Sequence, residues 1–107
     1  MTPETAAKTD ALIAQLWQRH LPTFIERLDT LERIAHAAAN GTLTEADRDQ
    51  AANIAHKFAG SLGMYGYPRG TEIAMQLENL YRNPPLEHPL QLVPLTSTLR
   101  CAIFPND

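Results

Sequence analysis

One histidine, His56, lies in a stretch of sequence where few side chains could shield it. Residues 51–67 read AANIAHKFAGSLGMYGY. On a helix with about 100° between successive residues, Ile54, Phe58 and Leu62 gather on one side and His56 projects from the other. We therefore expect an exposed imidazole. A neutral imidazole nitrogen is a nucleophile and needs no special base near neutral pH.

Small residues surround His56 in the same projection. A glycine in a helix interior lowers helix stability by about 0.8 to 1 kcal/mol relative to alanine. An inert surface could have avoided this cost, so Gly60 and Gly63 suggest a steric requirement. We predict that the backbone of another protein comes close to His56 and that a Cβ atom at Gly60 would hold it away. The predicted docking surface is shallow and apolar, and it comprises Ala52, Ala59, Gly60 and Gly63, with Met64 or Tyr67 at its rim.

Two plainer interpretations compete with this one. His56 could be an inert surface residue, and the glycines could admit a neighbouring helix of the same fold, although they project away from the apolar side. For the remaining histidines we expect an ordinary surface or core role; these are His20, His36 and His88.

The elements that position this segment are predicted to be helices, because nothing alternates with period two and good helix formers dominate. A first helix is expected from Thr9 or Asp10 to about His20, since Pro22 disfavours helix just before itself. Pro22 then opens a second helix, which ends at Asn40-Gly41.

The second half of the chain contains three more expected helices. Thr44 is the predicted N-cap of the helix that carries His56, which should run to Gly63 or Met64. Pro68 suits the first position of the next helix, and a last helix within 90–103 is expected to be kinked or delayed by Pro94. The predicted fold class is all-α: an antiparallel up-down-up-down four-helix bundle with an additional N-terminal helix.

Length and composition limit the function classes. The 107 residues suit one domain, 1–107. A formal net charge of −3 without a Lys/Arg run argues against nucleic acid binding. The single cysteine, Cys101, cannot form an internal disulfide, which favours a reducing compartment. With no signal peptide pattern and no apolar run of membrane-spanning length, we expect a cytoplasmic protein that contacts no membrane.

The run HKFAGS that begins at His56, followed by Gly63 and Gly66, resembles the signature of histidine-containing phosphotransfer (Hpt) domains. That signature is roughly His-Lys-Leu-Lys-Gly-Ser with a further Gly ten residues after the His. The resemblance extends more loosely over most of the chain and includes Leu77-Glu78, where the family often has Leu-Glu. The sequence departs from the pattern at Ala59, where many members carry a second lysine.

The resemblance implies a phosphorelay intermediate without kinase activity of its own. His56 would accept a phosphoryl group through Nε2 from the phospho-aspartate of a receiver domain and pass it to another receiver. Lys57 is a candidate to contact the phosphoryl group, and the interpretation that it is an ordinary solvated lysine has equal weight. Ser61 or Gln76 is a candidate to orient the ring through Nδ1. We expect a monomer without a cofactor of its own. Its expected partners are a hybrid sensor histidine kinase and receiver domains, and the receiver domains hold Mg²⁺.

Other function classes remain as alternatives. A helical-bundle interaction module could dock receiver domains without carrying phosphate, but such a degenerate member is expected to lose His56. A metal or haem protein is disfavoured because positions 59 and 60 hold no second ligand at helical spacing from His56. A kinase is disfavoured because no Gly-rich nucleotide-binding segment is present.

Overall fold

Helices account for every regular element in the part of the chain that the structure describes. The structure is a computed structural model that describes residues 3–105, with side-chain burial from Lys8 to Pro105. In chain order the elements are α1 (Pro3–Ala39), α2 (Glu45–Ser61), α3 (Pro68–Arg82), a short 3-10 helix η1 (Pro89–Gln91) and α4 (Leu92–Ile103). The predicted all-α class is confirmed.

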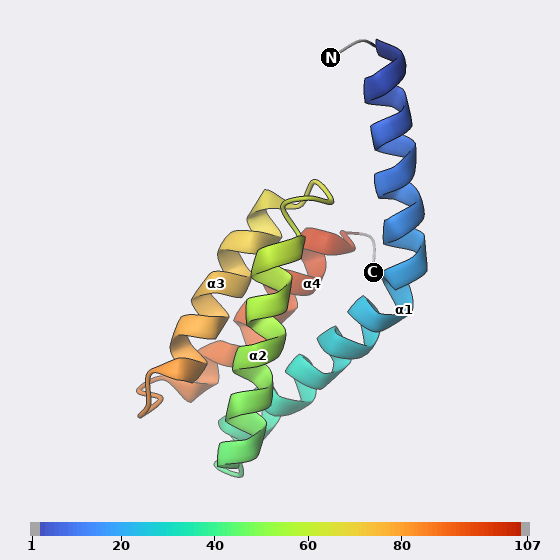
Figure 1. Cartoon of the computed structure of the whole chain (residues 1–107). Helices are drawn as coiled ribbons and strands as arrows, with labels where there is room; N and C mark the ends of the chain where they lie inside the picture. The colour runs from blue at the N-terminus through green and yellow to red at the C-terminus, as the bar shows by residue number, and fades with distance from the viewer. Residues whose placement is uncertain (1–2, 106–107) are drawn as a thin grey trace.

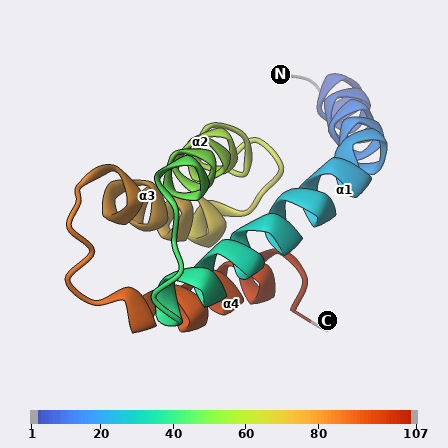
Figure 2. The same cartoon turned by 90° about the horizontal axis from the view of Figure 1, so that it is seen from below.

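The four α-helices form an antiparallel bundle. Successive helices run in opposite directions (Figure 1). The view from below shows α2 beside α3, and α1 beside α4, with α3 and α4 also in contact (Figure 2). The predicted up-down-up-down arrangement is confirmed. Among the described helices, none has the length and apolar character that crossing a membrane requires.

The expected break near His20 is wrong, because α1 continues through Pro22. Proline lacks an N–H and cannot bond to the carbonyl of Gln18, yet it can be held in a helix that bends. Figure 1 shows α1 changing direction near its middle. The additional N-terminal helix is therefore the first half of α1, and it extends beyond the other helices.

The apolar stripe of this first half is only partly covered. Leu12 is 60% exposed and Leu16 is 38% exposed, so the described part of the chain covers this end of the helix incompletely. Packing begins at Trp17, whose ring stacks on Phe24 with centroids 5.0 Å apart and lies 5.2 Å from the ring of Tyr65.

The core receives fully buried side chains from all four α-helices, including Leu28, Phe58, Leu77 and Leu99. Each such side chain contributes roughly 1.5 to 3 kcal/mol by leaving water. Phe58 of α2 also stacks on Phe24 of α1, with ring centroids 5.6 Å apart. The apolar side of α2 is thus fixed against its neighbours, which turns the opposite side outward.

Most helix ends follow the sequence signals. The Oγ1 atom of Thr44 accepts a hydrogen bond from the backbone N–H of Asp47 at 3.0 Å, which confirms the predicted N-cap. Gly41 has a φ of +74°, as expected after the end of α1, and Pro68 opens α3. Pro94 does not delay α4, because it lies in the first turn, where a backbone N–H has no partner within the helix.

Candidate functional site

His56 lies on the outer side of α2, as the helical projection predicts. Its side chain is 69% exposed, whereas Ala55 just before it and Phe58 two positions after it are buried. The imidazole is therefore within reach of another molecule while its backbone is held by the packed helix.

A carboxylate on the neighbouring helix fixes the orientation of this ring. The Nδ1 atom of His56 lies 2.9 Å from Oε2 of Glu78 on α3. In a neutral imidazole, a proton on Nδ1 that is donated to a carboxylate leaves Nε2 as the unprotonated nitrogen. In that tautomer the exposed ring presents an Nε2 lone pair that can act as a nucleophile.

Arg82 supports Glu78 from one turn further along α3. Its Nε atom donates to Oε2 of Glu78 at 2.7 Å, and its guanidinium reaches Oδ1 of Asn53 on α2 at 3.4 Å. The hydrogen bond from Arg82 is the main cause that lowers the pKa of Glu78 below its ordinary value of 4.5. Partial burial opposes the shift and the nearby His56 adds to it. Glu78 is therefore a carboxylate at neutral pH.

Sequence reasoning missed Glu78 as the partner of His56. Ser61 instead donates its hydroxyl to the backbone carbonyl of Lys57 at 2.9 Å, and Gln76 is not the residue bonded to Nδ1. The signal was present in the Leu77-Glu78 pair: Leu77 is buried, and the next residue emerges at the edge of α3 that faces α2.

The predicted docking surface beside His56 is called the bare strip below, because its residues have small side chains or none. Most of it is accessible. A Cβ atom added at Gly60 would meet nothing within 4 Å, so the fold itself does not require glycine there. Met64 is 53% exposed, Gly63 is exposed and Ala59 is half-buried. Tyr67 is half-buried because its ring packs against Trp17, with centroids 5.2 Å apart.

Two details of this strip differ from expectation. Ala52 is only 2% exposed and cannot belong to a docking surface, because α2 packs against both α1 and α3 and buries a wider arc than its large apolar residues mark. The helix also ends at Ser61, not at Gly63 or Met64. Gly63 therefore lies in the following turn, which Gly66 completes with a φ of +85°.

Lys57 lies on a different flank of α2 from His56. It lines two surface hollows together with Thr23 and Arg27 of α1, whereas Nδ1 of His56 is bonded to α3. The structure thus brings Glu78, and not Lys57, to the imidazole ring.

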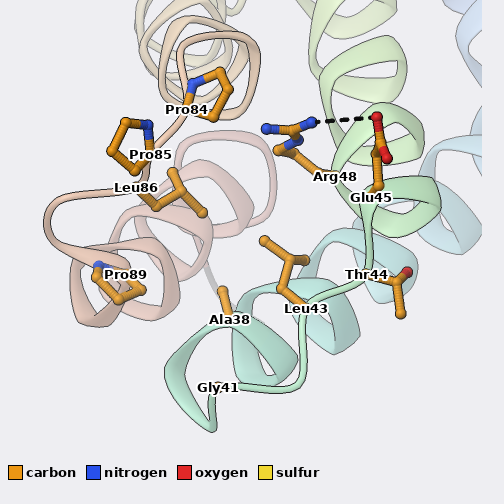
Figure 3. A pocket seen from close by; sticks show the side chains of 10 residues that line it. All are labelled: Ala38, Gly41, Leu43, Thr44, Glu45, Arg48, Pro84, Pro85, Leu86 and Pro89. Carbon is orange, nitrogen blue, oxygen red and sulfur yellow. Dashed lines mark ion pairs between the residues drawn. The ribbon is translucent and has the colours of Figure 1, made fainter.

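A hollow of about 540 Å³ lies at the far end of the bundle and does not belong to this site. Figure 3 shows Leu43 and Leu86 on its opposite walls and the Arg48 side chain reaching between α2 and the Pro84-Pro85 loop. Arg48 is in the first turn of α2, about 18 Å along the helix axis from Gly60.

Comparisons with known proteins bear on this site. The family model of the Hpt domain matches residues 10–102. Protein RcaC of Microchaete diplosiphon is 34% identical over 68 residues, which cover 64% of this chain and 10% of that protein. The chain therefore spans about a tenth of the length of this curated relative. No solved structure matches the chain.

Proposed function

Because this chain belongs to the Hpt domain family, whose members carry phosphoryl groups in two-component relays, we propose that His56 is its phosphorylated residue. In this proposal His56 accepts the phosphoryl group from the phospho-aspartate of one receiver domain and donates it to another. The observation that carries the proposal is the exposed imidazole with Nδ1 bonded to Glu78, which leaves Nε2 free to react.

The transfer conserves atoms and electrons in one step. The Nε2 lone pair forms a bond to phosphorus, and the bond from phosphorus to the aspartyl oxygen breaks. The electron pair of that bond returns to the aspartate as a carboxylate. The proton on Nδ1 stays in its hydrogen bond to Glu78, so the product is a phosphoimidazolium ring. Donation to the second receiver reverses these changes.

Glu78 acts as a positioning residue in this mechanism. Its hydrogen bond holds the tautomer that is reactive at Nε2, and its negative charge stabilises the positive charge that the ring gains on phosphorylation. Arg82 lowers the pKa of Glu78 further and limits the movement of its carboxylate. Nothing in this arrangement requires a cofactor bound to the chain itself.

The receiver domain supplies the remaining catalysis. Phosphoryl transfer depends mainly on in-line positioning and on neutralising the charge of the phosphoryl oxygens. A receiver that holds Mg²⁺ beside its aspartate provides that charge, while the strip formed by Ala59, Gly60, Gly63 and Met64 lets it approach His56. We propose that the chain does this as a monomer and that a hybrid sensor histidine kinase provides the first receiver.

A transfer assay tests the proposal. A phosphorylated receiver domain is mixed with the chain, and the label on the chain is expected to be labile in acid and stable in base. His56→Gln should abolish the label with an unchanged helical circular dichroism spectrum, whereas the control His36→Gln, at an exposed position of α1, should keep it. Labelling of His56→Gln would overturn the site, and receiver binding without labelling of the unaltered chain would favour the docking module.

A further inference from the structure

A second surface feature lies directly beside the bare strip, on the side of α2 that faces α1. It is a groove of about 470 Å³ between the middle of α1 and the last turns of α2. Gly60 and Lys57 line it from α2, His20 and Arg27 line it from α1, and Tyr65 from the turn after α2 also lines it. Because Gly60 belongs to both surfaces, a protein seated over His56 reaches the edge of this groove.

The groove is positively charged in a chain whose formal net charge is −3. Among the described residues that line it, none is acidic. Arg27 and Lys57 each carry a positive charge, and within the described part of the chain neither forms an ion pair. Their charges are therefore available to an outside partner.

Beyond the groove, the surface between α1 and α2 also carries acidic residues. The adjoining hollow shares Arg27 and Lys57 with the groove and adds Glu26 and Asp49. Further along, Arg33 of α1 lies 3.6 Å from a carboxylate oxygen of Asp47. Acidic residues thus line the surface further from Gly60, whereas none of the described residues that line the groove beside Gly60 is acidic.

We propose that this groove binds an acidic surface segment of the receiver domain and that Lys57 serves docking there and does not contact the phosphoryl group. The proposal rests on the proposed function, since the receiver is the partner that must reach His56. Arg27 and Lys57 form no ion pair among the described residues, so a segment that carries carboxylates is the surface that complements them. A local pair of cations beside the reactive residue orients that partner and raises the rate of productive encounter.

The position of Lys57 supports this assignment. His56 and Lys57 are successive residues, about 100° apart around the helix. The ring of His56 is bonded toward α3, and Lys57 lines hollows shared with α1. Lys57 is therefore placed on the α1 side of His56, where its ammonium group can meet a carboxylate of a receiver that covers the groove.

The test compares Arg27→Gln, Lys57→Gln and the double variant with Arg33→Gln, a control that removes one charge further along the same helix. The donor is a phosphorylated receiver domain from a response regulator of the same genome. At about 20 mM salt the double variant should lower kcat/KM about tenfold through KM, and at about 500 mM salt the difference should nearly vanish through screening. Arg33→Gln should match the unaltered chain under both conditions.

Phosphoramidate, a small donor that needs no docking, separates docking from chemistry. Its rate of labelling His56 should be the same for Lys57→Gln and the unaltered chain. A fall in this rate, or in kcat at saturating receiver, would show that Lys57 acts on the phosphoryl group and would overturn the inference. A kcat/KM that is unchanged in the double variant at low salt would overturn it as well.

The inference and the proposed function can fail separately. In a His56→Gln background no phosphoryl group can be carried on that residue, yet the Kd for an unphosphorylated receiver can still be measured by calorimetry. Adding Arg27→Gln and Lys57→Gln should raise this Kd about tenfold at low salt. An unchanged Kd contradicts the groove assignment, whatever the transfer assay shows.

Discussion

The Oε2 atom of Glu78 on α3 lies 2.9 Å from Nδ1 of His56 on α2, and this contact joins residues 22 positions apart in the chain. The same oxygen accepts a hydrogen bond from Nε of Arg82 at 2.7 Å. In the proposed mechanism, phosphoryl transfer therefore depends on the packing of α2 against α3 as well as on the helix that bears the histidine.

Replacing Glu78 by Gln should slow transfer without unfolding the chain. Glutamine can still accept a hydrogen bond from Nδ1, but it lacks the charge that strengthens the bond and stabilises the phosphorylated ring. The loss of charge assistance, about 1.4 kcal/mol, corresponds to about a tenfold lower rate. Single-turnover transfer from a phosphorylated receiver measures it, with Glu72→Gln, an exposed acid on the same helix, as the control. Equal rates for Glu78→Gln and the unaltered chain would refute the positioning role.

Replacing Arg82 by Gln should raise the pKa of Glu78 toward 4.5, because the Arg82 hydrogen bond is the largest cause that lowers it. A carboxylate with a lowered pKa in the folded state adds stability above its unfolded pKa, and this stability is lost as the pH falls through the folded value. The unaltered chain should thus lose more stability than Arg82→Gln on acidification below about pH 4.5. Carbon NMR titration of the Glu78 carboxyl checks the shift, and an unmoved titration curve would contradict it.

Replacing Gly60 by Leu should impair transfer and spare the fold. A Cβ atom at this position meets nothing within 4 Å, and leucine favours helix over glycine by up to about 1 kcal/mol. We expect an unchanged or slightly higher Tm together with transfer at least about tenfold slower, because the side chain blocks the approach of the receiver. Gly60→Ala serves as the intermediate control. Normal transfer by Gly60→Leu would contradict the docking surface.

Replacing Phe58 by Ala should have the opposite pattern. Phe58 is fully buried and stacked on Phe24, so its truncation should cost about 3 to 5 kcal/mol of unfolding free energy. Met75→Ala, at a side chain that is 58% exposed, should change stability by less than about 0.5 kcal/mol. Urea denaturation measures both. A loss below 1 kcal/mol for Phe58→Ala would show that this part of the core is not packed as described.

Sequence patterns predicted which segments are helical better than they predicted whether two neighbouring segments form one continuous helix. The periodicity around Phe58 placed His56 on the outer side of α2, and the signals at Thr44, Gly41 and Pro68 marked helix ends. Pro22 misled because a proline within a helix can mark either a break or a bend. Which of the two occurs depends on what packs on either side, and here Trp17 and Phe24 stack across that point and favour continuity.

The site was predictable as far as one helix could define it. Helical projection identified His56 and Gly60, since both depend only on positions within α2. It failed for Ala52 and for Glu78, because burial of the first and the contact of the second depend on how α3 lies against α2. The Leu77-Glu78 pair marks the edge of α3, but which residue of α2 that edge meets follows from the packing of the whole core.

Nitrogen and phosphorus NMR of the chain with ¹⁵N-labelled histidine shows directly whether Nε2 of His56 carries the phosphoryl group while Nδ1 stays bonded to Glu78. Before phosphorylation, the spectrum of His56 should show a proton on Nδ1 and none on Nε2. After phosphorylation by a receiver, phosphorus coupling should appear at Nε2 of His56 alone. Coupling at Nδ1, or at a histidine other than His56, would contradict the account.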